Sequence, residues 1–407
     1  MGGTARLLHR GEFTELWYRL DANSGPIVRK FSAHPGDDKL ENEAIFIRDT
    51  LPESAREYFC QVIGVERDVV GRSFSYEMPY YEGRLLRNIA LDRNTGIVES
   101  VNHIKASITA LRATLYAHPS TERPAEFARR NYVDRIVKRL GRFTDQADQA
   151  GWVGRADRAD RADRAVSITG THVGELSRFQ LDRAFRDIIS RPSVSLNGRT
   201  LLTPLAILDR IGASPSLMRI MMPRHSSMRL IHGDPHLGNI MIREGTDKPL
   251  FFDPNGFHTG GDMAYDIGKF IISLDYVEAA FERKLVLPTV SSGGGEITVG
   301  DLKSFVDPDL GRRSREIARA VIEDVLPEVF ATDLVADPGL LDRGILAADL
   351  HAFAAAHTFI PTTRSEVALP LLLYYLESAN DHLDLMERAG PDSSAGSALV
   401  PSIAWAP

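Results

Sequence analysis

The first part of the chain alternates apolar and polar residues as short β-strands do. The runs 13–20 (FTELWYRL) and 26–32 (PIVRKFS) are rich in aromatic and β-branched residues, and a turn-forming DANSG cluster separates them. Residues 38–52 instead have the spacing of an amphipathic helix. Its apolar stripe consists of Leu40, Ala44, Ile47 and Leu51. Strand-like runs return over 61–83, so we expect residues 1–83 to form a small β-rich lobe with one helix.

The pattern becomes mostly helical after residue 83. Residues 99–117 have the apolar spacing of an amphipathic helix, and 301–388 are helical in the same way. A hairpin over 194–202 is indicated by an Asn-Gly pair between two apolar runs. We therefore predict an α+β fold with two lobes, the β-rich one at 1–83 and a large helical one at 84–388.

Two segments lack the pattern of a packed core. Residues 154–166 (GRADRADRADRAV) repeat an Arg-Ala-Asp unit, which allows i,i+4 ion pairs but provides no apolar stripe. We expect this segment to be a solvated, mobile insertion. Residues 389–407 are rich in Pro, Ser and Ala, and we expect a disordered tail.

The stretch 230–256, LIHGDPHLGNIMIREGTDKPLFFDPNG, has polar groups that a core does not need. Two short strands flank the turn-forming EGTDKP, and an antiparallel hairpin brings its open ends together. This places Asn239, before the first strand, beside Asp253, at the end of the second. Amide and carboxylate oxygens of this kind suit Mg²⁺ that also binds substrate phosphates. Asp234, five residues before Asn239, is in the position of a proton acceptor for a substrate hydroxyl.

The order of these groups is that of a kinase catalytic loop. Asp-x-x-x-x-Asn followed by a hairpin and a second Asp is the arrangement in protein kinases. Here the loop reads His-Gly-Asp, so the arginine that would bind a phosphorylated activation loop is missing. The pattern favours a small-molecule kinase over a regulated protein kinase.

Three motifs resemble those of the aminoglycoside phosphotransferase/choline kinase family: IHGDPHLGNIM (231–241), FFDPNG (251–256) and GGDMAYDIGKF (260–270). In style they are most similar to phosphotransferases associated with sugars and cell-surface polysaccharide. The resemblance implies a protein-kinase-like fold and Mg²⁺-dependent transfer of a phosphoryl group from ATP or GTP to a hydroxyl of a small molecule. Asn255 departs from the arginine often found after Asp-Pro in such relatives, which puts the acceptor or its charge in doubt.

The resemblance also implies roles for residues of the N-terminal lobe. PIVRKFS is similar to the strand that carries the phosphate-binding lysine, here Lys30. Val28 lies on the same strand face and could contact the base. The partner of the lysine comes from the next helix, where Glu43 matches best and Glu41 is the alternative.

HRGEFTEL resembles the turn that covers the phosphates, with Gly11 for close backbone approach and Thr14 as a hydroxyl donor. YEMPYYEGRLL resembles the hinge between the lobes. Met78 would then lie at the back of the base pocket, with the backbone around Tyr80 facing the base. Pro79 has no N–H group, so a neighbour must supply any backbone donor, and the choice between ATP and GTP stays open.

Four further residues of the motifs are expected to support the site. We expect His232 to hold the loop by hydrogen bonds and His236 to lie just behind the reacting groups. Asp262 and Asp266 are expected to fix the loop rather than react, although Asp262 could also help to position substrate.

Composition and charge limit the partners and the cellular compartment that we expect for the protein. The chain has 407 residues and a formal net charge of −7, which argues mildly against nucleic acid as a partner. Cys60 is the single cysteine, so an intramolecular disulfide is excluded. The start of the chain has no apolar signal-peptide core, and the apolar run ALPLLLYYL is too short to span a bilayer. We expect a soluble, cytoplasmic protein without membrane insertion.

Several alternatives stay open at this stage. The acceptor could be a sugar, a polyol or an antibiotic, and an aminoglycoside would require clustered carboxylates. Glu323, Asp324 and Glu328 could form such a cluster, but a solvated helix face explains them equally well. A catalytically silent, nucleotide-binding pseudokinase is the alternative from another class, and the intact set of Asp234, Asn239 and Asp253 argues against it.

Overall fold

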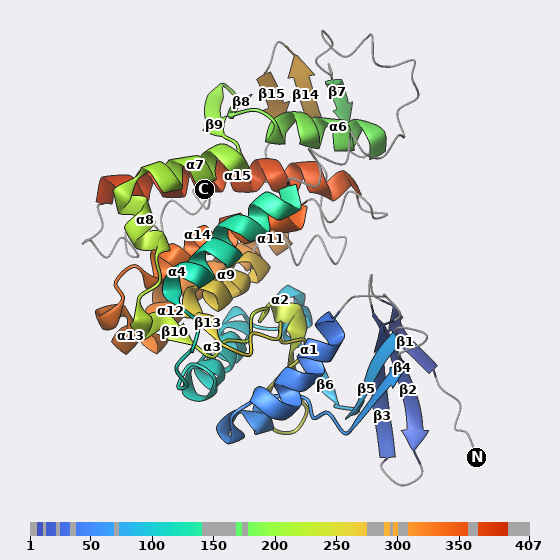
Figure 1. The fold of residues 1–407 in the computed structure, drawn as a ribbon. Helices are drawn as coiled ribbons and strands as arrows, with labels where there is room; N and C mark the ends of the chain where they lie inside the picture. The colour runs from blue at the N-terminus through green and yellow to red at the C-terminus, as the bar shows by residue number, and fades with distance from the viewer. Residues whose placement is uncertain are drawn as a thin grey trace. The chain divides into compact units, whose positions relative to one another are not determined.

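The structure is a computed structural model, and Figure 1 shows its ribbon. It describes residues 6–10, 14–21, 25–32, 38–68, 73–140, 168–172, 178–274, 289–293, 296–299, 308–356 and 365–389. The insertion predicted at 154–166, the tail from residue 390 and Gly11 lie outside the described residues.

The chain forms two compact units. The first comprises Met1–Glu122 and Met228–Asp266, and the second comprises Arg123–Ser227 and Ile267–Pro407. The predicted catalytic loop thus belongs to the same unit as the N-terminal sheet. The division into lobes at residue 83 stays a prediction.

The first unit begins with a five-stranded antiparallel sheet (Figure 1). Its strands in spatial order are β1 (Arg6–Arg10), β2 (Glu15–Asp21), β3 (Gly25–Ser32), β5 (Ser73–Pro79) and β4 (Gly64–Asp68). On β3, Val28, Lys30 and Ser32 are buried on one face, as period-two alternation requires. The sheet therefore turns a lysine toward the interior of its unit.

The predicted helix follows β3 along the chain. It consists of α1 (Lys39–Ile45), which continues into a π-helical turn, η1 (Phe46–Thr50), and a 3₁₀ turn, η2 (Glu53–Tyr58), comes after it. All four residues of the expected stripe are buried, namely Leu40, Ala44, Ile47 and Leu51. The apolar spacing thus correctly identified the inner face of this helix.

The hairpin of the catalytic loop is the second sheet of this unit. β11 (Ile240–Arg243) pairs on one side with β12 (Pro249–Phe251) and on the other with β6 (Gly83–Leu85). At Gly83 a Cβ atom would lie 2.3 Å from the carbonyl oxygen of Ile242, so only glycine allows this close pairing. β12 ends two residues before Asp253, which lies in the following loop rather than in the strand.

Short elements complete the first unit. A 3₁₀ turn, η7 (Leu237–Asn239), precedes β11, and β10 (Met228–Arg229) pairs with β13 (Gly261–Asp262). The helices are α2 (Leu86–Leu91) and α3 (Ile97–Thr114), and α3 confirms the amphipathic helix expected there. α9 (Met263–Leu274) starts in this unit and ends in the other.

The second unit is mainly helical. α14 (Leu340–Ala356) and α15 (Ser365–Ala389) pack together and bury most of their side chains. Other helices that the structure describes in this unit are α4 (Pro124–Ala128), η3 (Arg129–Asp134), α6 (Arg178–Ile189), α7 (Pro204–Ala213), α8 (Pro215–Met221), η6 (His225–Ser227), α11 (Pro308–Ala320), η9 (Val321–Val325), α12 (Leu326–Val329) and α13 (Ala331–Ala336). The predicted α+β class, with a small antiparallel N-terminal sheet and a helical C-terminal part, is confirmed.

The second unit also has a five-stranded sheet, of which only one hairpin was predicted. β8 (Ser193–Leu196) and β9 (Arg199–Leu202) form the expected hairpin, with positive φ at both residues of the Asn-Gly turn. β15 (Glu296–Val299) pairs in parallel with β8, and β14 (Thr289–Gly293) and β7 (Ile168–His172) extend the sheet. The sheet thus joins segments about 100 residues apart in the chain.

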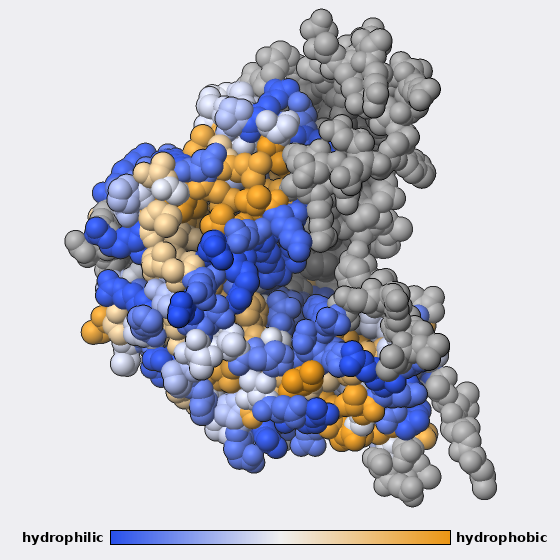
Figure 2. Space-filling view, in the orientation of Figure 1, coloured by the Kyte–Doolittle hydropathy of each residue, from blue (hydrophilic) through white to orange (hydrophobic). Residues whose placement is uncertain are grey.

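The visible surface of the described residues is mainly hydrophilic, with an apolar patch over the region of α7 and α15 (Figure 2). Several apolar residues of α7 are only half-buried, including Leu205 and Leu208. Among the helices that the structure describes, none has the length and apolar content needed to span a membrane.

Candidate functional site

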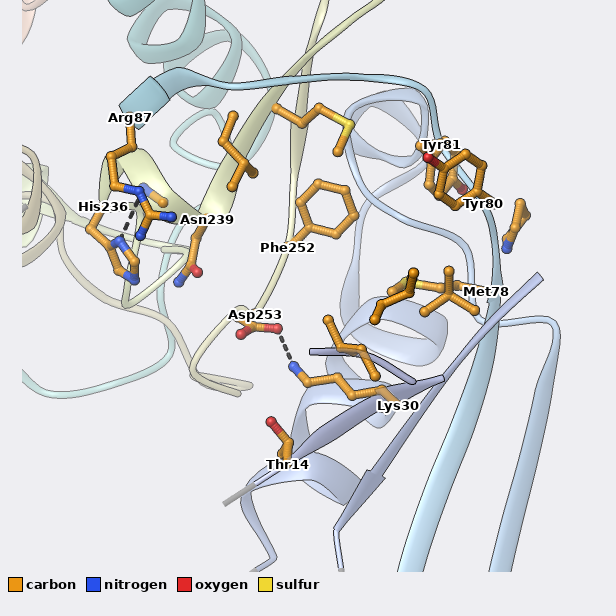
Figure 3. A pocket seen from close by; sticks show the side chains of 17 residues that line it. Thr14, Lys30, Met78, Tyr80, Tyr81, Arg87, His236, Asn239, Phe252 and Asp253 are labelled. Carbon is orange, nitrogen blue, oxygen red and sulfur yellow. Dashed lines mark hydrogen bonds and ion pairs between the residues drawn. The ribbon is translucent and has the colours of Figure 1, made fainter. Parts of the chain in front are cut away.

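A cavity of about 510 Å³ lies within the first unit. Its walls come from the N-terminal sheet, from the segment after β5, and from the catalytic loop with its hairpin (Figure 3). Lys30, Asn239 and Asp253 all line it, although more than 200 residues separate the first from the others. The fold therefore brings the predicted nucleotide-binding and metal-binding groups to one cavity.

Lys30 is held by a buried carboxylate from α1. Its Nζ donates to both carboxylate oxygens of Glu43, at 3.0 and 2.9 Å, and both residues are almost fully buried. Of the two glutamates considered, Glu41 instead pairs with Arg67 at 2.8 Å. Burial raises the pKa of Glu43 to about 7, although the Lys30 ammonium opposes this shift.

A tyrosine that was not predicted completes this pair. The Tyr76 hydroxyl donates to Glu43 Oε1 at 2.6 Å, and Tyr76 is 1% exposed. Tyr76 lies directly opposite Lys30 in the pairing of β3 with β5, so both side chains face the same side of the sheet. The alternation of β5, which places Tyr76 and Met78 on one face, is the sequence signal that could have identified it.

Asp253 faces the same lysine across the cavity. Lys30 Nζ donates to Asp253 Oδ1, the contact drawn in Figure 3. Partial desolvation in the cavity would raise the pKa of this carboxyl, but the Lys30 ammonium outweighs it and lowers the pKa to about 2. Burial also opposes the charge of Lys30, and the carboxylates of Asp253 and Glu43 overcome it and raise the lysine pKa. Asp253 keeps 38% of its side chain exposed and has a φ of 54°, a backbone conformation uncommon outside glycine.

Asn239 and Asp234 are connected through the loop itself. Asn239 Nδ2 donates to the backbone carbonyl of Asp234 at 3.0 Å, which fixes the orientation of the Asn239 amide. Figure 3 shows the Asn239 and Asp253 side chains on the same side of the cavity. Asp234 is half-buried on the same loop and is not among the cavity-lining residues.

Asp266 secures the start of this loop. Its carboxylate accepts hydrogen bonds from the backbone N–H groups of His232 and Gly233, at 2.8 and 2.7 Å, and from the Tyr116 hydroxyl at 2.9 Å. Burial raises the pKa of Asp266 to about 7, and these three donors oppose that shift. These hydrogen bonds tie α9 to the start of the loop, and the role of Asp266 in fixing the loop stays a prediction.

Each of the other three predicted supporting residues accepts a hydrogen bond from the backbone N–H group two residues further along the chain. Asp262 Oδ1 accepts from the Ala264 N–H at 3.2 Å, at the start of α9. His232 Nδ1 accepts from the Asp234 N–H at 3.2 Å, and burial lowers the pKa of His232 to about 4, so the ring is neutral at pH 7. His236 Nδ1 accepts from the Gly238 N–H at 3.1 Å.

The predicted hinge forms the other end of the cavity. Met78, Pro79, Tyr80 and Tyr81 line it there, whereas Thr14, directly before β2, lies near Lys30 (Figure 3). The Tyr80 N–H donates to the carbonyl of Pro26 at 2.9 Å, so it is engaged by β3. Since Pro79 has no N–H, a donor to a base must come from a later residue, of which Tyr81 is the first.

Arg87 also lines the cavity and was not predicted. It is the second residue of α2, and no local motif marks it. Its position beside the catalytic loop depends on the pairing of β6 with β11, which joins segments more than 150 residues apart.

The donor set fits a magnesium ion that is shared with phosphate oxygens. Asn239 and Asp253 offer one amide oxygen and one carboxylate, the hard oxygen ligands that Mg²⁺ prefers. Within the described part of the chain, no group of three or more His, Cys, Asp or Glu residues could hold a metal.

Comparison with known families agrees with the motifs. Residues 128–286 match the model of the phosphotransferase enzyme family, APH. The predicted family resemblance is confirmed. The matched segment contains Asp234, Asn239 and Asp253, whereas Lys30 and Glu43 precede it.

Solved structures align over most of the chain at low identity. Spectinomycin phosphotransferase, APH(9)-Ia, in complex with ADP and spectinomycin is 10% identical, covers 98% of this chain and 93% of its own, and has a TM-score of 0.44. The GDP and kanamycin complex of APH(2")-IIia is 11% identical over 92% and 94%, with a TM-score of 0.40. The MAP kinase LmaMPK10 from Leishmania major is 11% identical over 98% and 93%, with a TM-score of 0.28. No curated protein matches the chain.

Proposed function

We propose that the protein is a small-molecule kinase that transfers the γ-phosphoryl group of ATP or GTP to a hydroxyl of a sugar-like, polyol or antibiotic acceptor, with Mg²⁺. The observation that carries this proposal is that Lys30, Asn239 and Asp253 line one cavity, and that Lys30 is held there by Glu43. The family match to a phosphotransferase model supports the reaction class.

The lysine end of the cavity is suited to phosphate. Lys30 is a charged donor whose orientation is fixed by Glu43, and Glu43 is fixed in turn by Tyr76. In phosphoryl transfer the protein contributes mainly positioning and charge stabilisation, which a preorganised ammonium provides. Lys30 would neutralise the phosphates, and Asn239 and Asp253 would hold Mg²⁺, which supplies further neutralisation of phosphate charge.

Asp234 is the group that receives the proton. The acceptor hydroxyl oxygen forms a bond to the γ-phosphorus, and the bond from that phosphorus to the bridging oxygen of the nucleotide breaks. The hydroxyl proton passes to the Asp234 carboxylate, and the nucleoside diphosphate leaves. A positioned carboxylate of this kind typically contributes about 10²–10⁴-fold to the rate.

Three acidic residues bear on whether the acceptor is an aminoglycoside. Glu323, Asp324 and Glu328 are exposed on η9 and α12, and Glu323 lies 3.8 Å from Arg319. Their exposure favours a solvated helix face, so these residues do not argue for an aminoglycoside.

The net charge of −7 and the single, buried Cys60 support a cytoplasmic enzyme with no nucleic-acid partner.

A nucleotide-consumption screen tests the proposal. Purified protein is mixed with ATP or GTP, Mg²⁺ and panels of sugars, polyols, nucleosides and aminoglycosides, and nucleoside diphosphate is measured. We expect one acceptor class to raise consumption above a slow, Mg²⁺-dependent hydrolysis seen without acceptor. Nucleotide binding with neither acceptor-dependent consumption nor hydrolysis would instead favour the pseudokinase.

A further inference from the structure

Among the described residues, one lysine and one arginine line the cavity, and the proposed function uses only the lysine, Lys30. The other, Arg87, lies on a different wall. Figure 3 shows its guanidinium beside His236 and Asn239, on the far side of the cavity from Lys30. A Cβ atom placed on Gly238 would lie 3.3 Å from Arg87 Nη1, so the guanidinium rests against the backbone of the catalytic loop.

Strand pairing explains why Arg87 lies there. In the antiparallel pairing of β6 with β11, Leu85 is opposite Met241, and both residues line the cavity. Arg87 is two residues after Leu85, and Asn239 is two residues before Met241. In an antiparallel pair these two positions lie on the same side, opposite each other. The turn from β6 into α2 thus brings a guanidinium next to the predicted metal ligand.

The two ends of the cavity are chemically different. The hinge, with Met78 and Tyr81, is the end suited to a base, and Lys30 with Asp253 is the end suited to phosphates. A nucleotide that reaches both ends must place its ribose between them. On the wall formed by β6, α2 and η7, Arg87 is the charged donor that lines the cavity, beside Asn239 and His236, and its long side chain is the one on that wall that could reach this middle part.

We propose that Arg87 is a specificity-determining residue that donates hydrogen bonds to the ribose hydroxyls of the nucleotide and so selects ribonucleotides over deoxyribonucleotides. This inference rests on the proposed function. Arginine carries five N–H donors and no acceptor, and it stays charged at all relevant pH values. A hydroxyl oxygen with its lone pairs matches such a donor, whereas a deoxy carbon leaves the guanidinium without that bond.

The test compares nucleotides that differ only in one hydroxyl. Calorimetry measures the affinity of ATP, 2′-deoxy-ATP and 3′-deoxy-ATP for the full chain with Mg²⁺, and guanine counterparts replace them if GTP binds more tightly. A hydrogen bond to a charged group contributes about 1.5–3 kcal/mol, so the full chain should bind at least one deoxy analogue roughly 10- to 100-fold more weakly. Arg87→Met should bind the ribose and deoxy forms equally.

A matched control and a second ligand separate the alternatives. Arg84→Met makes the same change three residues earlier, at an exposed arginine paired with Asp92, and should keep the discrimination. Adenosine has the ribose but no phosphate, so Arg87→Met should weaken its binding as well. Discrimination that persists in Arg87→Met, or adenosine binding that does not change, would overturn the inference while nucleotide binding still supports a kinase. Absence of any nucleotide binding would overturn both.

Discussion

The hydroxyl of Tyr76 lies 2.6 Å from Oε1 of Glu43, and that carboxylate in turn holds Lys30. All three residues are buried, so the ammonium that faces the cavity is oriented by a chain of hydrogen bonds rather than by solvent. Each link can be removed by a small change in one side chain.

Tyr76→Phe removes one link with little change of shape. Without the hydroxyl, the buried carboxylate of Glu43 loses a donor, and Lys30 is oriented less firmly. We expect affinity for Mg-nucleotide to fall about 10-fold, since a hydrogen bond to a charged group contributes about 1.5–3 kcal/mol. Calorimetry measures this affinity. Tyr58→Phe, at a half-buried residue outside the cavity, is the control, and an unchanged affinity in Tyr76→Phe would show that Glu43 does not need this donor.

Asp234→Asn and Asp253→Asn should separate catalysis from metal binding. Both keep the size of the side chain. We expect Asp234→Asn to bind Mg-nucleotide like the native chain while turnover falls about 10²–10⁴-fold. Asp253→Asn should lose both turnover and the Mg²⁺-dependent part of the affinity.

Turnover is measured on the acceptor found by the screen, and affinity by calorimetry with and without Mg²⁺. Asp247→Asn is the matched control, because Asp247 is exposed in the turn of the same hairpin. Its φ of 53° is readily adopted by asparagine, so both quantities should stay unchanged. Full turnover in Asp234→Asn would rule out its role as the base.

Gly233→Ala tests how tightly the catalytic loop is packed. Gly233 has a φ of 82°, and an added Cβ would lie 2.3 Å from the ring of Phe257. We expect a marked loss of activity, because the loop between His232 and Asp234 must shift. Gly245→Ala has a similar φ of 75° with nothing within 4 Å, so it introduces only the backbone strain, about 1–2 kcal/mol. Equal activity and melting temperature in the two variants would show that the steric contact is relieved elsewhere.

Arg343→Met should destabilise the second unit strongly. Arg343 is fully buried, and its Nη2 lies 2.6 Å from Asp337 Oδ2 and 3.1 Å from Ser227 Oγ. Removing the guanidinium leaves the Asp337 carboxylate buried without this partner, which typically costs about 3–5 kcal/mol. Arg312→Met, in an exposed pair with Asp309, should cost at most about 1 kcal/mol. Denaturant unfolding of both variants measures the difference, and similar losses would contradict the assignment.

Asp342 should make stability depend on pH. Burial raises the pKa of this carboxyl to about 7, although Arg343 and His382 oppose the shift, and its Oδ1 has no hydrogen-bond partner among the described residues. The folded pKa lies above the unfolded value of about 3.9. The ionised carboxylate therefore lowers the free energy of unfolding, and this loss is absent below pH 4 and grows as pH rises to 7. Asp342→Asn should therefore melt several degrees higher than the native chain at pH 8, with a difference that shrinks toward pH 4.

Thermal unfolding from pH 4 to 8 measures this dependence. Asp209→Asn, at an exposed position of α7, makes the same change at the surface and should leave the melting curve unchanged at every pH. A constant difference between Asp342→Asn and the native chain across the range would show that the carboxyl does not change its charge on folding.

The sequence alone determined the features that depend on nearby residues. Period-two alternation placed Val28 and Lys30 on one face of β3, and helical spacing identified the buried stripe of α1. The Asn-Gly pair specified the β8–β9 hairpin, because a tight turn depends on the residues within it. The motif spacing also led to Asn239 and Asp253, since a short hairpin brings its own ends together.

Only the tertiary structure decided which distant side chains meet. The choice of Glu43 over Glu41 followed from the side of α1 that faces Lys30, and Tyr76 and Arg87 entered the site through pairings of β3 with β5 and of β6 with β11. The sheet that joins β7, β8 and β14 was missed for the same reason. Backbone hydrogen bonds between distant strands are available to almost any sequence, so local periodicity cannot specify the partner, and the packing of the whole chain must select it.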